Sequence, residues 1–166
     1  PAKKPGLLVT LHGHGGNAES MVLRDFAARR KWPVLAVQGG GDVQTPQGPG
    51  HQCDGPDAAY IAAMAKWCVQ NRGIDAAKVV SFGHSAGGTM ALYAHTADPS
   101  AFTGIITCSA PAVPDKSHED ARVVVFLGTA DPNFSNAAGI QGRMKKESGH
   151  LALTMMEGAE HNDLPA

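Results

Sequence analysis

A serine flanked by glycines follows a short apolar run in the middle of the chain. Residues 83–87 are Gly-His-Ser-Ala-Gly, and the apolar run before them predicts a β-strand over 79–82. Residues 86–95 predict a helix. A sharp turn from strand to helix would lift the Ser85 hydroxyl off the end of a sheet, and the glycines would let helix and strand pass closely. A chance match in a chain with 20 glycines is the alternative.

Strand and helix patterns alternate along the chain, which predicts an α/β fold. The expected strands are residues 7–11, 33–37, 79–82, 104–108, 122–127 and 151–156, and the expected helices are residues 17–31, 56–71, 86–95 and 136–148. Residues 38–55 are rich in glycine and proline and predict a long loop. We therefore expect a mainly parallel sheet of about six strands that is flanked by helices.

The length and charge indicate one ordinary globular unit. A chain of 166 residues suffices for one core, so residues 1–166 are expected to form a single domain. The net charge is −1 and the basic residues are scattered, which argues against nucleic acid as a partner. No apolar stretch approaches the length of a membrane span, and the first residues lack the apolar segment of a signal peptide. A soluble protein is expected, either secreted or periplasmic or cytoplasmic.

The three cysteines leave the compartment open. Cys53 and Cys68 are candidates for a disulfide, whereas Cys108 lies in an apolar run and is expected to pack as a small apolar side chain. Three cysteines are too few for a disulfide scaffold.

Residues that carry chemistry follow four of the predicted strands. The glycine-rich segment 12–16 follows the first strand, Ser85 the third, Asp131 the fifth and His161 the sixth. In a parallel sheet the carboxyl ends of the strands lie along one edge, where ligands bind. We therefore expect these four groups to meet at that edge.

Asp131 and His161 are the expected partners of Ser85. A serine hydroxyl becomes a good nucleophile when a histidine takes its proton, and a carboxylate holds that histidine in the correct tautomer. Asp131 directly follows a buried strand, although an ordinary Asp-Pro turn is the alternative for it. The other acidic candidates, none of which directly follows a strand, are Asp120, Glu160 and Asp163. His161 follows the last strand and is the candidate base.

Other histidines have more ordinary explanations. His118 lies in a polar stretch and is expected at the surface, and His150 precedes a strand, at the wrong end of the sheet. His95 ends a helix, where a cation suits the helix dipole. His51 lies in the long loop and is a candidate contact to substrate.

Two backbone N–H groups are expected to hold an oxyanion. One belongs to Ala86, which follows the serine at the start of a helix. The other should come from the segment 12–16, with His14 favoured and Gly15 as the rival. His12 and His14 also form a His-x-His pair that is seen in metal sites, but no further Cys or carboxylate ligand lies nearby in the sequence. No metal and no cofactor is therefore expected.

Several segments together resemble the α/β-hydrolase superfamily, and most closely its poly(3-hydroxybutyrate) depolymerase and feruloyl esterase-like branch. They are His-Gly-His-Gly-Gly at 12–16, Asp-Ala-Ala-Tyr-Ile at 57–61, Ile-Asp-Ala-Ala-Lys-Val at 74–79, the serine turn at 83–88, Gly-Thr-Ala-Asp-Pro at 128–132, and His161. The likeness covers roughly residues 6–164. It implies a minimal α/β-hydrolase core, because about six strands are expected where the superfamily usually has eight, and no cap domain is inserted between Cys108 and Arg122.

The resemblance implies a serine esterase that works through an acyl-enzyme. Ser85, Asp131 and His161 would be its catalytic residues, and the backbones of His14 and Ala86 would form its oxyanion hole. Open alternatives are a polyester depolymerase or feruloyl-type esterase, a thioesterase or peptidase with the same machinery, and a non-catalytic binding module on a hydrolase scaffold.

The expected partner is a small-molecule or polymeric ester. Gly15, His51 and Phe134 are the candidate contacts to that substrate. No membrane or nucleic-acid partner is expected. The chain is expected to be a monomer or a homodimer, since a strand at 33–37 on the edge of the sheet would invite pairing with a second copy.

Overall fold

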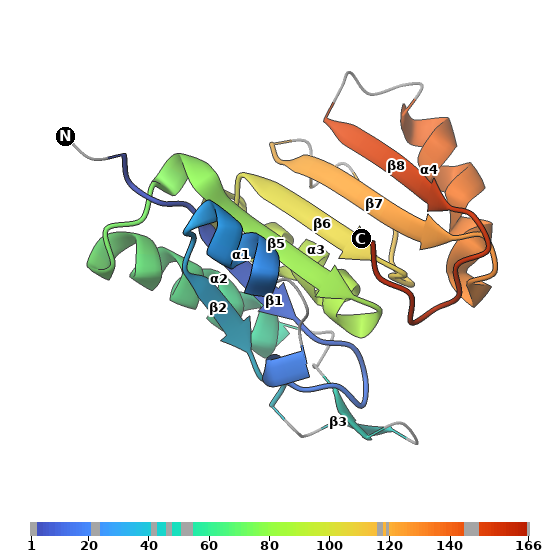
Figure 1. Ribbon diagram of the computed structural model, residues 1–166, viewed down its shortest axis with the longest axis horizontal. Coiled ribbons are helices and arrows are strands. Elements are labelled where there is room, and N and C mark those ends of the chain that lie inside the picture. Colours follow the sequence, from blue (N-terminus) through green and yellow to red (C-terminus); the bar gives the residue numbers. More distant parts are fainter. Residues whose placement is uncertain are drawn as a thin grey trace.

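A six-stranded parallel sheet forms the centre of the molecule (Figure 1). The computed structural model describes residues 3–20, 24–40, 43–45, 48–50, 55–115, 118, 120–144 and 150–165. The strands of the sheet are β1 (Leu7–Leu11), β2 (Val34–Val37), β5 (Val79–His84), β6 (Gly104–Cys108), β7 (Arg122–Gly128) and β8 (Leu151–Met156). Their order is β2-β1-β5-β6-β7-β8, and each neighbouring pair is parallel. The predicted α/β fold and its six strands are confirmed.

Burial on both faces explains why apolar runs become strands. All five side chains of β1 are buried, as expected for a central strand of a parallel sheet. Leu11, the last residue of β1, pairs with Gly83 near the end of β5. The loop that follows β1 therefore begins beside the serine turn.

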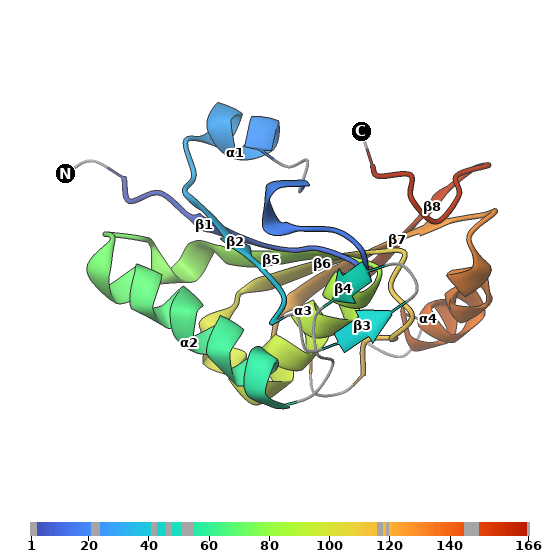
Figure 2. The same cartoon turned by 90° about the horizontal axis from the view of Figure 1, so that it is seen from below.

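Helices cover the two faces of the sheet unequally. Figure 2 shows α2 (Gly55–Asn71), α3 (Ala86–Ala97) and α4 (Asn136–Met144) on one face, with α1 (Arg24–Arg30) and the C-terminal segment on the other. Under α2, α3 and α4 lies the larger apolar cluster, which includes Ile61, Met90, Leu92, Val123 and Ile140. The other face holds a small buried cluster of Leu8, Phe82 and Cys108, against which Leu164 packs. No helix in the described part of the chain is long and apolar enough to cross a membrane.

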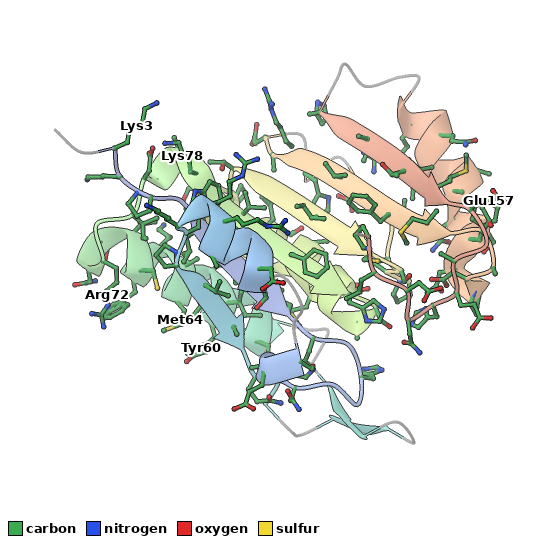
Figure 3. The ribbon with its side chains drawn as sticks, in the orientation of Figure 1. Lys3, Tyr60, Met64, Arg72, Lys78 and Glu157 are labelled. Carbon is green, nitrogen blue, oxygen red and sulfur yellow. The ribbon has the colours of Figure 1, made fainter. Side chains whose placement is uncertain are left out.

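The helix α2 separates a buried side from an exposed one. Ala58, Ile61 and Ala65 are buried, and their small size lets α2 approach the core closely. Tyr60 and Trp67 lie on the exposed side. Figure 3 labels Tyr60 and Met64 on α2 and Arg72 just after its last residue. It also labels Lys3 and Lys78 near the amino ends of the strands, and Glu157 beyond the carboxyl end of β8.

The structure corrects the prediction of one helix over 17–31. Residues 18–20 form a short 3-10 helix, η1 (Ala18–Ser20), and the α-helix covers only 24–30. Asn17 Oδ1 accepts a hydrogen bond from the Ser20 N–H at 2.8 Å, and the Ser20 hydroxyl donates to the Asn17 carbonyl at 2.7 Å. Such local bonds of Asn and Ser compete with the α-helical ladder, so the helix starts later.

The predicted loop 38–55 contains a small hairpin. Strands β3 (Val43–Thr45) and β4 (Gly48–Gly50) pair antiparallel, and Figure 1 places β3 beyond the carboxyl end of β2. Strands this short carry too little periodicity to be recognised from sequence. His51 and Cys53 lie outside the described residues, while Cys68 on α2 carries a free thiol.

Candidate active site

Ser85 occupies the turn between β5 and α3 in a strained backbone conformation. Its φ is 53° and its ψ is −121°, a region that non-glycine residues rarely adopt and that costs about 1–3 kcal/mol. The Ser85 N–H donates to the Cys108 carbonyl at 2.8 Å, and the Ser85 carbonyl accepts from the Gly88 N–H at 2.9 Å. These bonds tie the turn to β6 on one side and to α3 on the other.

The glycines around Ser85 allow strand and helix to touch. A Cβ on Gly83 would lie 2.1 Å from the Gly87 carbonyl oxygen, and a Cβ on Gly87 would lie 2.2 Å from the Leu11 carbonyl oxygen. Both contacts are to backbone atoms, which cannot move aside without a large cost in free energy. The glycine spacing seen in the sequence is therefore a packing requirement of this turn.

The structure brings Ser85, His161 and Asp131 into one hydrogen-bonded chain. His161 Nε2 lies 2.9 Å from Ser85 Oγ, and His161 Nδ1 lies 3.2 Å from each Asp131 carboxylate oxygen. A carboxylate only accepts hydrogen bonds, so Nδ1 carries the proton and Nε2 accepts from the serine hydroxyl. The Asp131 side chain is fully buried, whereas that of His161 is 34% exposed.

Asp131 is held in its charged form by hydrogen bonds. Burial acts to raise the pKa of Asp131, but bonds from the Ser109 hydroxyl, the Asn133 N–H and His161 outweigh it and lower the pKa. The Asn133 N–H donates to Asp131 Oδ1 at 2.7 Å, which also caps the 3-10 helix η5 (Pro132–Ser135). The Asp-Pro turn that was the alternative interpretation is therefore present as well, and it supports the carboxylate.

Ser109 is a supporting residue that the sequence did not reveal. It directly follows β6, is completely buried, and has a positive φ of 54°. Its carbonyl accepts from the Asn133 side-chain amide at 3.0 Å, in addition to the hydroxyl bond to Asp131. Its position after the fourth predicted strand, at the same edge of the sheet, was the signal that could have indicated it.

His12 supports the loop 12–16 from within. It is buried, and its Nε2 accepts from the Gly39 N–H at 3.0 Å and from the Gln38 side-chain amide at 3.1 Å. Its Nδ1 lies 2.8 Å from the Gly13 carbonyl, to which it donates. Both ring nitrogens are thus used inside the protein, which disfavours the metal site considered for His12 and His14.

The loop 12–16 lies against the serine turn. A Cβ on Gly13 would be 3.1 Å from Ser85 Cβ, so glycine permits this approach. Ala86 is the first residue of α3, where a backbone N–H has no acceptor within the helix. His14 is exposed at the tip of the loop. The oxyanion roles of Ala86 and His14 stay predictions.

A cavity of about 300 Å³ lies beside this loop. Its lining residues are His12, Gly13, His14, Gly15, Gly16, Ser20, His84, Asn162 and Leu164. Gly15, one predicted substrate contact, is among them. Phe134, another, instead packs against the larger apolar cluster from η5, and His51 lies outside the described residues. The substrate contacts therefore stay predictions.

The other candidate acids and bases have structural roles where the structure shows their contacts. Asp163 Oδ2 accepts from the Glu160 N–H at 2.8 Å and shapes the turn that carries His161. The prediction that His118 lies at the surface is wrong, because it is only 4% exposed and its Nε2 lies 3.2 Å from the Leu92 carbonyl. His95 is also buried, with its ring centroid 5.6 Å from that of His118.

The chain is similar in sequence to part of one family. The sequence profile of the prolyl oligopeptidase family matches residues 55–115, which is less than half of the chain. The matched segment runs from the start of α2 through the serine turn to a point beyond the end of β6. A comparison with curated protein sequences found no match.

Solved structures share the fold of nearly the whole chain. A carboxylesterase from Mesorhizobium loti is 15% identical with a TM-score of 0.73, over 98% of this chain and 84% of that one. An esterase from Pyrobaculum calidifontis is 16% identical with a TM-score of 0.71, over 98% and 70%. A puromycin-hydrolyzing peptidase from Mycobacterium tuberculosis is 18% identical with a TM-score of 0.74, over 98% of this chain but 31% of that one. At these identities the similarity shows a common fold.

Proposed function

We propose that this chain, which has the α/β-hydrolase fold, is a serine hydrolase that cleaves carboxylic esters through an acyl-enzyme. The observation that carries the proposal is the hydrogen-bonded chain from Ser85 through His161 to the buried Asp131. These groups come from the ends of three different strands and meet at the carboxyl edge, where such sheets bind ligands. The strained backbone of Ser85 adds to the case, since strain of this kind gathers at functional sites.

In the first half-reaction, Ser85 Oγ attacks the ester carbonyl carbon while His161 Nε2 takes the hydroxyl proton. The carbonyl π electrons move to oxygen and form an oxyanion. When the intermediate collapses, the bond to the alcohol oxygen breaks and His161 returns the proton to that oxygen. The alcohol leaves, and Ser85 keeps the acyl group as an ester.

In the second half-reaction, water replaces the alcohol and the same steps run in reverse. His161 takes a proton from water, the resulting hydroxide attacks the acyl carbon, and Ser85 leaves as an alcohol with the proton returned to it. The Asp131 carboxylate stabilises the imidazolium that forms in each half. The N–H groups of Ala86 and His14 are proposed to hold the oxyanion.

The site suits an ester that reaches it from an open surface. The described residues between β6 and β7 form a short connection with no inserted cap, and the neighbouring cavity is lined by glycines and polar side chains together with Leu164. Part of a small ester, or the end of a polyester chain as in the depolymerase branch that the sequence resembles, would fit such a site.

A peptidase is the second candidate. The match of residues 55–115 to the prolyl oligopeptidase family favours it, because the same triad can expel an amine in place of an alcohol. Turnover of p-nitrophenyl acetate and butyrate compared with turnover of aminoacyl p-nitroanilides distinguishes the two.

Labelling with a fluorophosphonate tests the proposal. The wild type should be labelled on Ser85 and should hydrolyse the nitrophenyl esters, whereas Ser85→Ala should lose labelling and about 10³-fold or more of its turnover. Ser100→Ala, which changes an exposed serine in η3 (Pro99–Ala101), is the matched control and should keep both. A folded wild type that neither labels nor turns over would contradict the proposal and favour a non-catalytic binding module.

A further inference from the structure

The histidine that precedes Ser85 joins the two loops of the site. We propose that His84 is a positioning residue that holds the backbone of His161 against the serine turn, an inference that rests on the proposed function. It assigns a task to the second residue of the Gly-His-Ser-Ala-Gly segment, which the proposed chemistry does not use.

The central contact is a hydrogen bond between side chain and backbone. His84 Nε2 lies 2.7 Å from the His161 carbonyl oxygen. A carbonyl only accepts, so Nε2–H is the donor. The two rings lie side by side, with centroids 5.3 Å apart and planes inclined by 53°. The side chain of His84, the residue before Ser85, therefore holds the backbone carbonyl of His161.

Several other hydrogen bonds hold the loop that carries His161, among them two that lie close to that residue. The Ala130 N–H donates to the Ala159 carbonyl at 3.0 Å, and the Glu160 N–H donates to Asp163 Oδ2 at 2.8 Å. In the described part of the chain, these bonds hold the residues on either side of His161, whereas the bond from His84 is made to the carbonyl of His161 itself. The bond from His84 therefore acts on His161 itself, where a small displacement would move His161 Nε2 away from Ser85 Oγ.

The opposite side of the His84 ring faces the loop 12–16. A Cβ on Gly13 would lie 3.1 Å from His84 Nδ1 and 3.2 Å from the His84 carbonyl oxygen, so this loop packs tightly against the ring. His84 also lines the neighbouring cavity together with His14 and Asn162. One side chain therefore touches both the loop proposed to hold the oxyanion and the loop that carries the base.

The charge state of His84 suits this task. Burial lowers the pKa of His84 most, and positive charge on the His161 ring also lowers it. The bond to the His161 carbonyl and the negative charge of Asp131 act to raise this pKa. The net effect is a lowered pKa, which keeps the ring neutral with its proton on Nε2. A neutral donor can hold His161 without opposing the positive charge that the base must accept during reaction.

A pair of substitutions of equal length separates the hydrogen bond from mere packing. Glutamine and methionine have nearly the same size, but only glutamine can donate to the His161 carbonyl. In His84→Met we expect kcat on p-nitrophenyl acetate to fall about 10- to 100-fold with KM nearly unchanged, because a misplacement of about 1 Å costs that much. His84→Gln should recover most of the loss. His150→Gln is the control and should match the wild type, because His150 comes just before β8, at the end of the sheet away from the site.

Hydrogen exchange supplies a readout that does not depend on activity. In a Ser85→Ala background, the backbone amides of residues 160–164 should exchange faster with His84→Met than with His84→Gln. Equal kcat and equal exchange in the two variants would overturn the inference. A wild type without turnover would contradict the proposed function instead, and the exchange rates would still decide whether His84 holds the base loop.

Discussion

The two ends of the candidate triad are held in place very differently. Ser85 lies on a turn whose neighbours Gly83 and Gly87 touch backbone, between a central strand and a buried helix. His161 lies on a partly exposed segment after the edge strand β8 and is positioned by individual hydrogen bonds, chiefly to His84 and Asp131. The proposed nucleophile is thus fixed by close packing, and the proposed base by polar contacts.

This difference predicts which substitutions should lower stability and which should lower activity. Close packing cannot be relaxed locally, so a side chain added at Gly83 or Gly87 should disturb the fold around Ser85. A hydrogen bond beside His161 can be lost while the fold remains. Substitutions that remove the polar contacts of His161 should therefore lower activity more than stability, and substitutions at the two glycines should lower both.

The largest expected effect is on the base side. Asp131→Asn should lower kcat about 10⁴-fold, because an amide in place of the carboxylate favours the wrong tautomer of His161 and cannot stabilise its charge. Asp75→Asn is a matched control, since Asp75 also caps a 3-10 helix, η2 (Ala76–Lys78), by accepting from the Ala77 N–H. It should leave kcat unchanged. Equal losses in the two variants would mean that Asp131 serves only as a cap.

Two glycine substitutions test directly whether close packing around Ser85 contributes to the stability of the fold. Gly87→Ala should cost about 3 kcal/mol or more of unfolding free energy, because its Cβ would lie 2.2 Å from the Leu11 carbonyl oxygen. Gly158→Ala, near the base, should cost only about 1 kcal/mol, since its φ of 69° is strained for alanine but its surroundings are open. Urea unfolding followed by circular dichroism measures both. A smaller cost at Gly87 than at Gly158 would reverse the comparison.

The pH dependence of stability isolates the charge on Asp131. Its folded pKa is lowered, so the carboxylate contributes stability above the unfolded pKa of about 3.9 and loses that contribution as pH falls through the folded value. The stability of the wild type relative to Asp131→Asn should therefore be constant near neutral pH and should decline on acidification below about pH 4–5. An unchanged difference down to pH 3 would mean that the charge is not held by the fold.

The reactivity of the Cys108 thiol measures how readily the C-terminal segment that carries His161 moves away from the sheet. Cys108 accepts from the Ser85 N–H through its carbonyl, while its Sγ lies 3.7 Å from the Asp163 carbonyl. Burial raises the pKa of Cys108 to about 11, so the thiol is almost wholly protonated at pH 8. Iodoacetamide should modify the half-buried Cys68 well before Cys108, as peptide mass spectrometry would reveal. Faster modification of Cys108 would show that the C-terminal segment opens readily.

The smallest effect is expected far from both ends of the triad. Lys66 Nζ on α2 lies 2.8 Å from Asp98 Oδ2, but both side chains are partly exposed. Exposed ion pairs contribute less than about 1 kcal/mol. Lys66→Ala should therefore change neither kcat nor, within about 1 kcal/mol, the unfolding free energy. A larger loss of kcat would indicate that α2 is coupled to the site.

Much of the fold was predictable because its signals are local. Apolar runs marked all six strands of the sheet, with the bounds of β1, β6 and β8 matching to the residue. Since parallel strands end at one edge, the positions of Ser85, Asp131 and His161 after three strands were enough to expect their meeting. The prediction of a helix over 17–31 was partly wrong because the bonds between Asn17 and Ser20 form a 3-10 turn there, and the α-helix starts only at Arg24.

The residues that support the site could be found only in three dimensions. His12, His84 and Ser109 act on partners that are distant in sequence, through the Gly39 N–H, the His161 carbonyl and the Asp131 carboxylate. The burial of His118 also depends on a distant partner, because its ring packs against α3 and bonds to the carbonyl of Leu92. Hydrophobic periodicity records which side of a segment faces the core, so the sequence was enough to predict the strands of the main sheet and the three members of the candidate triad. Hydrogen bonds between distant segments leave no such periodic pattern, so the side chains that hold the triad in place became visible only once the chain was folded.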